Sequence, residues 1–302
     1  MVKKKTFLQR LINRNFGKTA GDRTFHAFNY LFFALIAIIM IYPFIYVLVK
    51  SLTVYKIGAD GIPIETFSFA AYQYFIHEKA TMMALIRTFI IMFFKVLIAL
   101  LVTFLMAYPL SKKYLKGRTA ISMFMLITMY VSGGVIPTFI LIRQTFHWTN
   151  NYLTYIIPSC VAAYNVFVVK AFLQNIPESL EEAAIIDGAN SFEVFFKIYV
   201  PLSGPIVATI GLWEGVALWN NWTTGLYYFT DTSKYVFVSK LRALLSEMSS
   251  SASGDGGNQS ILAMTENKKM AMIVLGILPI LLVYPFVQKY FVKGMLVGSV
   301  KG

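Results

Sequence analysis

The sequence predicts an all-α membrane protein with six transmembrane helices. Of its 302 residues, 57% are hydrophobic and only 14% are charged, and the mean hydropathy is +0.64. The apolar residues also gather in long runs that contain no Asp, Glu, Lys or Arg, at 26–49, 119–142 and 144–169. A run of about 20 apolar residues is long enough to cross a bilayer core of ~30 Å. Such runs must be helical, because lipid offers no hydrogen-bond partners to open backbone groups.

The six spans are expected in one continuous membrane domain that covers residues 27–291. In chain order, they are predicted at 27–50, 84–110, 119–142, 152–174, 203–224 and 270–291. A basic segment, 1–26, precedes the domain, and a tail, 292–302, follows it. Prolines within several spans do not contradict this assignment, because membrane helices tolerate proline better than soluble helices do.

The distribution of charge predicts the orientation of the chain. The formal net charge is +13. In a soluble protein this would suggest nucleic acid, but here the basic residues gather at the ends of the spans. We therefore expect membrane lipid around the chain and no nucleic-acid partner. The 1–26 segment holds seven Lys or Arg residues and the 111–118 connection holds four. The positive-inside rule then places both termini and the 175–202 connection in the cytoplasm, and the 225–269 loop outside.

The 175–202 connection is too polar to span a membrane and too helical in its pattern to be a plain loop. Pro177 suits the first turn of a helix, and Gly188 suits its end. Ser191 is then expected to cap a second short helix. The result is a helix–turn–helix at the membrane surface. From these residues alone, an amphipathic interfacial helix without a partner is an equally good interpretation.

The same segment resembles a known signature. Glu182-Ala183-Ala184, followed by Gly188 and then by Ile198 and Pro201, resembles the EAA motif of ABC importer permeases. The longer run EEAAIIDGANSFEVFFKIYVPL is similar to its form in carbohydrate-uptake permeases of the maltose-transporter type, although Val200 stands where that family more often has Leu. Further stretches resemble the subgroup that imports complex oligosaccharides and polysaccharide fragments; they are 107–118, 132–141, 208–222 and 284–302.

This resemblance implies a type I ABC importer permease fold, with 27–291 as the permease domain and a cytoplasmic EAA coupling helix. It implies import of oligosaccharides or polysaccharide fragments across a bacterial plasma membrane. The expected partners are a second homologous permease subunit, two copies of a cytoplasmic ATP-binding subunit and an extracellular solute-binding protein. The residues expected to couple the chain to the ATPase are Glu182, Ala183, Ala184, Asp187 and Gly188.

The sequence shows no means of catalysis. It has no GxxxxGK[ST] phosphate loop, no HExxH and no paired Cys/His set. We therefore expect a non-catalytic subunit without a cofactor or metal, whose ATP is hydrolysed by a partner. The alternative is a secondary transporter of a small solute driven by an ion gradient. That class predicts internal repeats and broken helices around a midplane site, and no clear repeat relates the two halves of this chain.

Two charged residues inside predicted spans are candidates for the substrate path. Lys95 lies near the middle of the second span, and Glu214 lies near the middle of the fifth. Intramembrane charges are costly and face interiors or partners. Three alternatives stay open: Lys95 and Glu214 pair with each other, they face the partner permease subunit, or Lys95 lines the pore and meets an anionic sugar.

Aromatic and amide side chains extend this candidate path. Sugars present flat C–H faces to aromatic rings and hydroxyl groups to amides. Trp219 and Asn220, near the end of the fifth span, offer one of each. Asn165, in the fourth span, is a weaker candidate. The ordinary alternative for such tryptophans is anchoring at the membrane interface.

Overall fold

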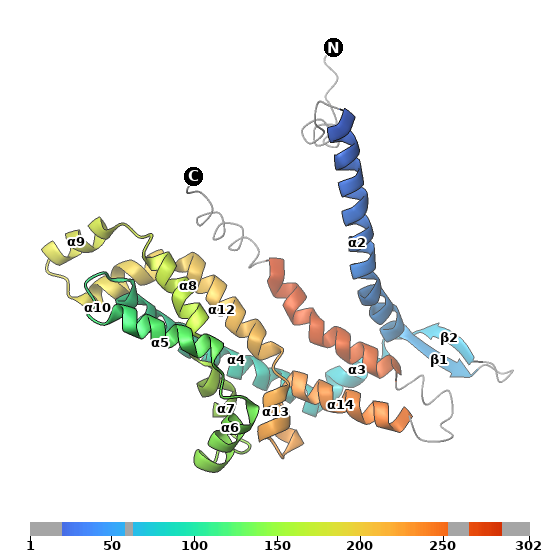
Figure 1. The fold of residues 1–302 in the computed structure, drawn as a ribbon. Coiled ribbons are helices and arrows are strands. Elements are labelled where there is room, and N and C mark those ends of the chain that lie inside the picture. Colours follow the sequence, from blue (N-terminus) through green and yellow to red (C-terminus); the bar gives the residue numbers. More distant parts are fainter. Residues whose placement is uncertain (1–19, 58–62, 253–265, 286–302) are drawn as a thin grey trace. The chain divides into compact units, whose positions relative to one another are not determined.

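The computed structural model describes residues 20–57, 63–252 and 266–285 (Figure 1). All of the tail 292–302 and most of the basic segment 1–26 therefore lie outside the described residues. The chain divides into two compact units. Among the described residues, the first unit holds 20–57, 63–71 and 266–274, and the second holds 72–252 and 275–285.

The first unit contains the first span and a small hairpin. Helix α2 (Ala20–Leu52) is apolar over most of its length and begins seven residues before the predicted span. Strands β1 (Thr53–Ile57) and β2 (Pro63–Phe67) follow as an antiparallel pair, in a register that sets Thr53 opposite Phe67. The Asn267 amide donates to the carbonyl oxygens of Lys50 and Ser51, at 3.1 and 2.8 Å. The all-α prediction thus holds apart from this hairpin.

The second unit is built around helix α4 (Lys79–Ser111), which runs through it without a break. Helices α8 (Ala163–Leu173) and α12 (Gly204–Trp219) pack along α4 (Figure 1). One apolar cluster lies toward the C-terminal end of α4 and includes Phe104 and Leu110. A second cluster lies toward its N-terminal end and includes Ile91. The remaining helices are α3 (Ala70–His77), α5 (Arg118–Tyr130), α6 (Val135–Ile140), η1 (Leu141–Thr145), α7 (Leu153–Ile156), η2 (Ile157–Ser159), α9 (Glu178–Ile186), α10 (Ser191–Val194), η3 (Phe195–Tyr199), α11 (Val200–Leu202), α13 (Thr223–Tyr228), η4 (Thr232–Lys234), α14 (Phe237–Ala252) and Glu266–Pro285.

Three of the six predicted spans are single unbroken helices, and two more are helix pairs with a bend between them. Within the described ranges, Thr24–Leu52, Lys79–Ser111 and Glu266–Pro285 are each long and apolar enough to cross a membrane. Three helix pairs also pass this test together, with bends of 103°, 55° and 79°; they are Arg118–Tyr130 with Val135–Thr145, Leu153–Ser159 with Ala163–Leu173, and Ser191–Leu202 with Gly204–Trp219. If each pair counts as one span, the described residues hold six candidate spans, but the first half of the last pair, Ser191–Leu202, lies in the predicted 175–202 connection and not in the predicted span 203–224.

The breaks correct the expectation that spans three and four are continuous. Between α5 and α6 the chain passes through Gly134, whose φ of +83° lies in the left-handed region that glycine adopts at little cost. In the fourth span, the first helical segment ends after Ser159 in the short turn η2, which contains Pro158, a residue without a backbone N–H. The 225–269 segment, expected as a loop, carries η4 and the long helix α14.

The two ends of the second unit carry different elements. Helices α9 and α10 lie at one end, and α6, α7 and α13 lie at the other (Figure 1). The contacts of α4 agree with this arrangement. Near its N-terminus, Arg87 donates to the carbonyl oxygens of Ser233 and Tyr235, both at 2.9 Å. At its C-terminal end, Lys112 forms an ion pair with Glu181 of α9. Helix α4 therefore links the α9 end to the opposite end.

Candidate functional site

The 175–202 segment forms the predicted helix–turn–helix. Helix α9 begins after Pro177, one residue later than expected, and ends before Asp187. Gly188 follows with φ +84°. The backbone N–H of Gly188 donates to the carbonyl of Ile185 at 3.0 Å, which satisfies one of the open carbonyls at the helix end. Gly188 adopts this left-handed conformation because it carries no Cβ.

The cap of the second short helix differs from the prediction. Asn190, not Ser191, precedes α10 as its N-cap. Its side-chain oxygen accepts from the backbone N–H of Glu193 at 3.0 Å, and the Glu193 carboxylate accepts from the backbone N–H of Asn190 at 3.1 Å. This reciprocal capping box satisfies two open donors. The prediction that Ser191 is the cap was wrong by one residue.

Removal of this cap is expected to loosen α10. Asn190→Ala deletes the side-chain acceptor and should cost about 1 kcal/mol of local stability. Ser191→Ala, at the neighbouring position inside the helix, should cost much less. Amide hydrogen exchange of the 190–200 segment in detergent-solubilised protein would compare the two variants. Faster exchange in Ser191→Ala than in Asn190→Ala would contradict the assignment of the cap.

Four of the five predicted coupling residues are exposed on and just after α9. They are Glu182, Ala183, Asp187 and Gly188, while Ala184 is half-buried and packs against the apolar cluster at this end of the unit. Large apolar side chains are exposed beside them, and Ile186 is 84% exposed. An exposed apolar surface of this kind marks interaction sites in proteins.

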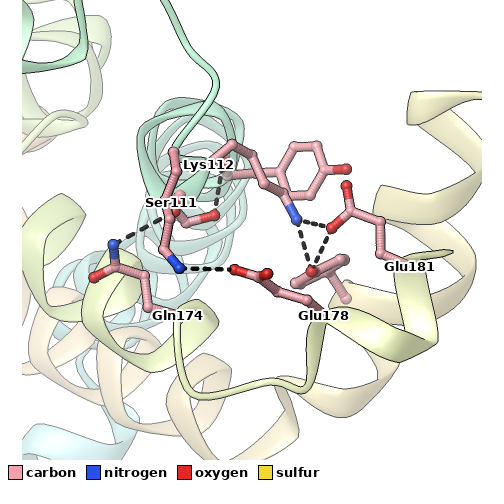
Figure 2. A network of polar contacts seen from close by, with 8 residues as sticks. Ser111, Lys112, Gln174, Glu178 and Glu181 are labelled. Carbon is pink, nitrogen blue, oxygen red and sulfur yellow. Dashed lines mark hydrogen bonds and ion pairs between the residues drawn. The ribbon is translucent and has the colours of Figure 1, made fainter.

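A buried polar cluster lies under α9 (Figure 2). Lys112, the residue directly after α4, forms an ion pair with Glu181 of α9. The Lys112 ammonium also donates to the Tyr199 hydroxyl at 2.6 Å, and this hydroxyl donates to Glu181 Oε2 at 2.8 Å. The side chains of Lys112 and Glu181 are only 9% and 11% exposed. The cluster thus connects α4, α9 and η3.

Two tyrosine rings complete the surroundings of Lys112. Its Nζ lies 3.9 Å from the ring centroid of Tyr199 and 4.7 Å from that of Tyr108. Ring faces attract cations, and the attraction is stronger where water is displaced. Burial and the nearby Glu181 carboxylate raise the pKa of Tyr114 in the adjoining connection. The cation at position 112 is therefore held by a carboxylate, a hydroxyl and two rings.

Exposed contacts surround this cluster. Lys113 pairs with Glu178 at 3.4 Å, with both side chains more than 70% exposed. The Gln174 amide donates to the Ser111 carbonyl at 3.4 Å (Figure 2). Exposed ion pairs contribute little, since water and salt screen them. Buried contacts, rather than these, fix α9 to the end of α4.

Sequence reasoning did not single out Lys112, Glu181 or Tyr199. The available signal was a pair of lysines at the end of an apolar span, on the side of the membrane where the acidic 175–202 segment is expected. That signal does not choose between Lys112 and Lys113, or between the three glutamates of α9. The choice depends on which side chains are buried, and Lys112 and Glu181 are 69 residues apart.

The structure pairs Lys95 with Glu214, which confirms the first of the three alternatives. Lys95 Nζ lies 2.8 Å from Glu214 Oε2, and both side chains are almost fully buried. The Asn165 amide donates to Glu214 Oε1 at 2.7 Å. Three predicted path residues thus meet where α4, α8 and α12 pack together. Along α4, Lys95 lies between Ile91 of one apolar cluster and Phe104 of the other.

The last two predicted path residues are placed differently. Trp219 is 4% exposed, and its Nε1 donates to the Gly276 carbonyl at 3.0 Å. Its ring packs between Phe89 and Phe237, with centroids 5.6 and 5.9 Å away. Asn220 is exposed directly after α12. The structure therefore does not bring Trp219 and Asn220 together with the buried Lys95 cluster.

The described part of the chain offers no group of three or more His, Cys, Asp and Glu residues placed to hold a metal ion. In the same part of the chain, the buried carboxylates of Glu181 and Glu214 each form an ion pair with a lysine. The site consists of the exposed helix α9, a buried ion pair beneath it, and the long helix α4, which leads to a second buried ion pair. This arrangement is suited to transmitting movement.

Known proteins resemble this chain over nearly its whole length. Residues 99–297 match the family described as "Binding-protein-dependent transport system inner membrane component". The polygalacturonan/rhamnogalacturonan transport system permease protein YtcP of Bacillus subtilis (strain 168) is 37% identical over 290 residues, which cover 93% of this chain and 99% of YtcP. Protein LplC of the same strain is 34% identical over 287 residues, which cover 94% and 97%.

A solved structure agrees with these relatives. A crystal structure of a bacterial ABC transporter involved in the import of the acidic polysaccharide alginate contains a chain that matches with a TM-score of 0.79. The two chains are 26% identical, and the match covers 91% of this chain and 99% of the other. This chain therefore shares its fold with a chain of an ABC transporter.

Proposed function

Because this chain belongs to the family of inner-membrane components of binding-protein-dependent transport systems, we propose that it is a permease subunit for sugars. Its cargo is oligosaccharides or polysaccharide fragments, as the names of YtcP and of the alginate importer suggest. The chain forms half of the pore, and a second homologous permease subunit forms the other half. An extracellular solute-binding protein delivers the sugar.

The observation that carries this proposal is the exposed face of α9. Glu182, Ala183, Asp187 and Gly188 are exposed, and so are Ile185 and Ile186 between them. This face docks in a cleft of a cytoplasmic ATP-binding subunit, of which the assembled transporter holds two copies. ATP is hydrolysed there, and the closure of the ATP-binding subunits moves α9.

The proposed docking of α9 also implies an orientation for the chain. With α9 in the cytoplasm, the opposite end of the second unit faces outward, and with it α13, η4 and α14 (Figure 1). The Asp231 carboxylate at this end accepts hydrogen bonds from the hydroxyl and backbone N–H of Ser233, which lower its pKa. Both chain termini are cytoplasmic in this arrangement, and the 225–269 segment is a surface for the solute-binding protein.

The five predicted path residues take two roles in this proposal. Asn220 is exposed and contacts the hydroxyl groups of the sugar. Lys95, Asn165, Glu214 and Trp219 are buried and hold the helices that shape the path. The buried pairing of Lys95 with Glu214 supports this division, because a lysine closed by a carboxylate has no free charge to offer an anionic sugar.

Reconstitution tests the proposed function. Proteoliposomes would contain this chain, its partner permease and the ATP-binding subunits, with the solute-binding protein and a labelled oligosaccharide outside. We expect uptake only when the ATP-binding subunits and ATP are both present. Omission of either is the matched control. Uptake driven by a proton or sodium gradient in their absence would instead identify a secondary transporter.

A further inference from the structure

We propose that the Lys112–Glu181–Tyr199 cluster is the joint through which movement of α9 reaches α4. This inference rests on the proposed function and adds a set of positioning residues to it. The joint is distinct from the docking face, because Lys112 and Glu181 are buried beneath α9 while Glu182 and Gly188 are exposed. The exposed residues receive the movement from the ATP-binding subunit, and the buried cluster transmits it to α4.

The first argument concerns how α9 is attached. It is a short helix of nine residues, and the turn at Gly188 separates it from α10. Backbone connections of this kind transmit force poorly, since a loop can change its dihedral angles instead. The ion pair of Lys112 with Glu181 resists separation, because opening it would leave two charges in a poorly hydrated site. The two tyrosine rings add to this resistance at Lys112.

The second argument concerns what the joint is attached to. Lys112 follows α4 directly, and α4 is continuous from Lys79 to Ser111, whereas three of the other candidate spans are bent. Lys95 precedes Ser111 by sixteen residues, which is about 24 Å along a helix. There Glu214 and Asn165 connect α4 to α12 and α8. A displacement at Lys112 therefore moves a continuous helix that has a further polar attachment deep among the spans.

A neighbouring contact provides the matched comparison. Lys113 and Glu178 join the same two segments at 3.4 Å, but both side chains are exposed. Water and salt weaken such a pair, so it opens without much cost. If proximity of opposite charges were sufficient, both lysines would matter equally for transport. If burial makes the joint, only Lys112 matters.

The test measures uptake per ATP hydrolysed in the reconstituted complete transporter. Lys112→Met is expected to leave the ATP-binding subunits bound and hydrolysing ATP, while the ratio of labelled oligosaccharide taken up to ATP hydrolysed falls about tenfold or more. Lys112→Arg keeps a cation between the rings and should retain most of the ratio. Lys113→Met should leave the ratio unchanged. Tyr199→Phe removes only the bridging hydroxyl and should lower the ratio by a smaller factor.

Several results would overturn the joint. One is a wild-type ratio of uptake to ATP hydrolysis in Lys112→Met. If Lys112→Met does not fold, a wild-type ratio in Tyr199→Phe would have the same meaning. Loss of the ATP-binding subunits from the Lys112→Met complex would also overturn it, because the cluster would then only support the docking face. An equal fall in Lys113→Met would show that burial is irrelevant. The proposed function fails separately, since ATP-independent uptake would already appear with the wild-type chain.

Discussion

A chain carrying Gly188→Asp is expected to insert into the membrane normally, yet to lose both its ATP-binding subunits and sugar uptake. Gly188 lies at the end of the docking face with φ +84°, and no atom lies within 4 Å of an added Cβ. The new side chain therefore projects into the space that the partner must occupy. It adds backbone strain of about 1 kcal/mol. We expect the affinity for the ATP-binding subunit to fall roughly 30-fold, as for a hot-spot residue.

Gly117 supplies the control for this experiment. It has almost the same backbone conformation, with φ +79°, and likewise no atom within 4 Å of an added Cβ. Gly117→Asp therefore introduces a similar strain and the same charge at a position outside α9 and its docking face. Co-purification of the ATP-binding subunit and uptake by cells would compare Gly188→Asp, Gly117→Asp and the charge reversal Glu182→Lys. Normal uptake by Gly188→Asp or Glu182→Lys would contradict the assigned docking face.

A chain carrying Lys95→Gln is expected to be markedly less stable than the wild type. The substitution leaves the Glu214 carboxylate buried with the Asn165 amide as its remaining partner. Removing one member of a buried ion pair typically costs about 3–5 kcal/mol. Glu214→Gln should cost a similar amount. The double variant should lose less than the sum of the two single variants, because the two amides can hydrogen-bond to each other.

Thermal unfolding of the purified protein in detergent measures this cycle. Lys197→Gln is the matched control, because Lys197 pairs with Glu193 at 2.9 Å but its side chain is 72% exposed. We expect little change in that variant. Uptake assays add a second readout, and Lys95→Gln should reduce uptake of uronic-acid and neutral oligosaccharides alike. Additive single effects, or a loss confined to the acidic sugar, would mean that Lys95 acts on the cargo and not on the packing.

The spans show where sequence reasoning succeeds and where it stops. Long apolar runs place the helices, because transfer of each residue into lipid is a local property. The runs do not show the break between α5 and α6, although Gly134 lies there, since glycine and proline also occur in straight membrane helices. Whether a helix continues depends on neighbours that satisfy the freed backbone groups.

The candidate site shows the same limit at the scale of single side chains. The EAA-like run predicted the helix that became α9 and the turn at Gly188, because these follow from consecutive residues. It did not predict that Glu181 is buried while Glu182 is exposed. Glu181 is buried because Lys112 and Tyr199 contact it in the folded chain. Neither residue lies near Glu181 in the sequence.

The sequence by itself determined that this protein is a helical membrane protein with a surface helix–turn–helix and no phosphate loop of its own. Those properties depend on composition and on spacings within about one helical turn, and both can be read directly from the sequence. Only the tertiary structure decided which charges meet. It joined Lys95 to the buried carboxylate of Glu214, and it placed Lys112, not Lys113, in the buried contact with α9. The physical reason is that the strength of an ion pair depends on burial and distance, and both arise only when distant helices pack together.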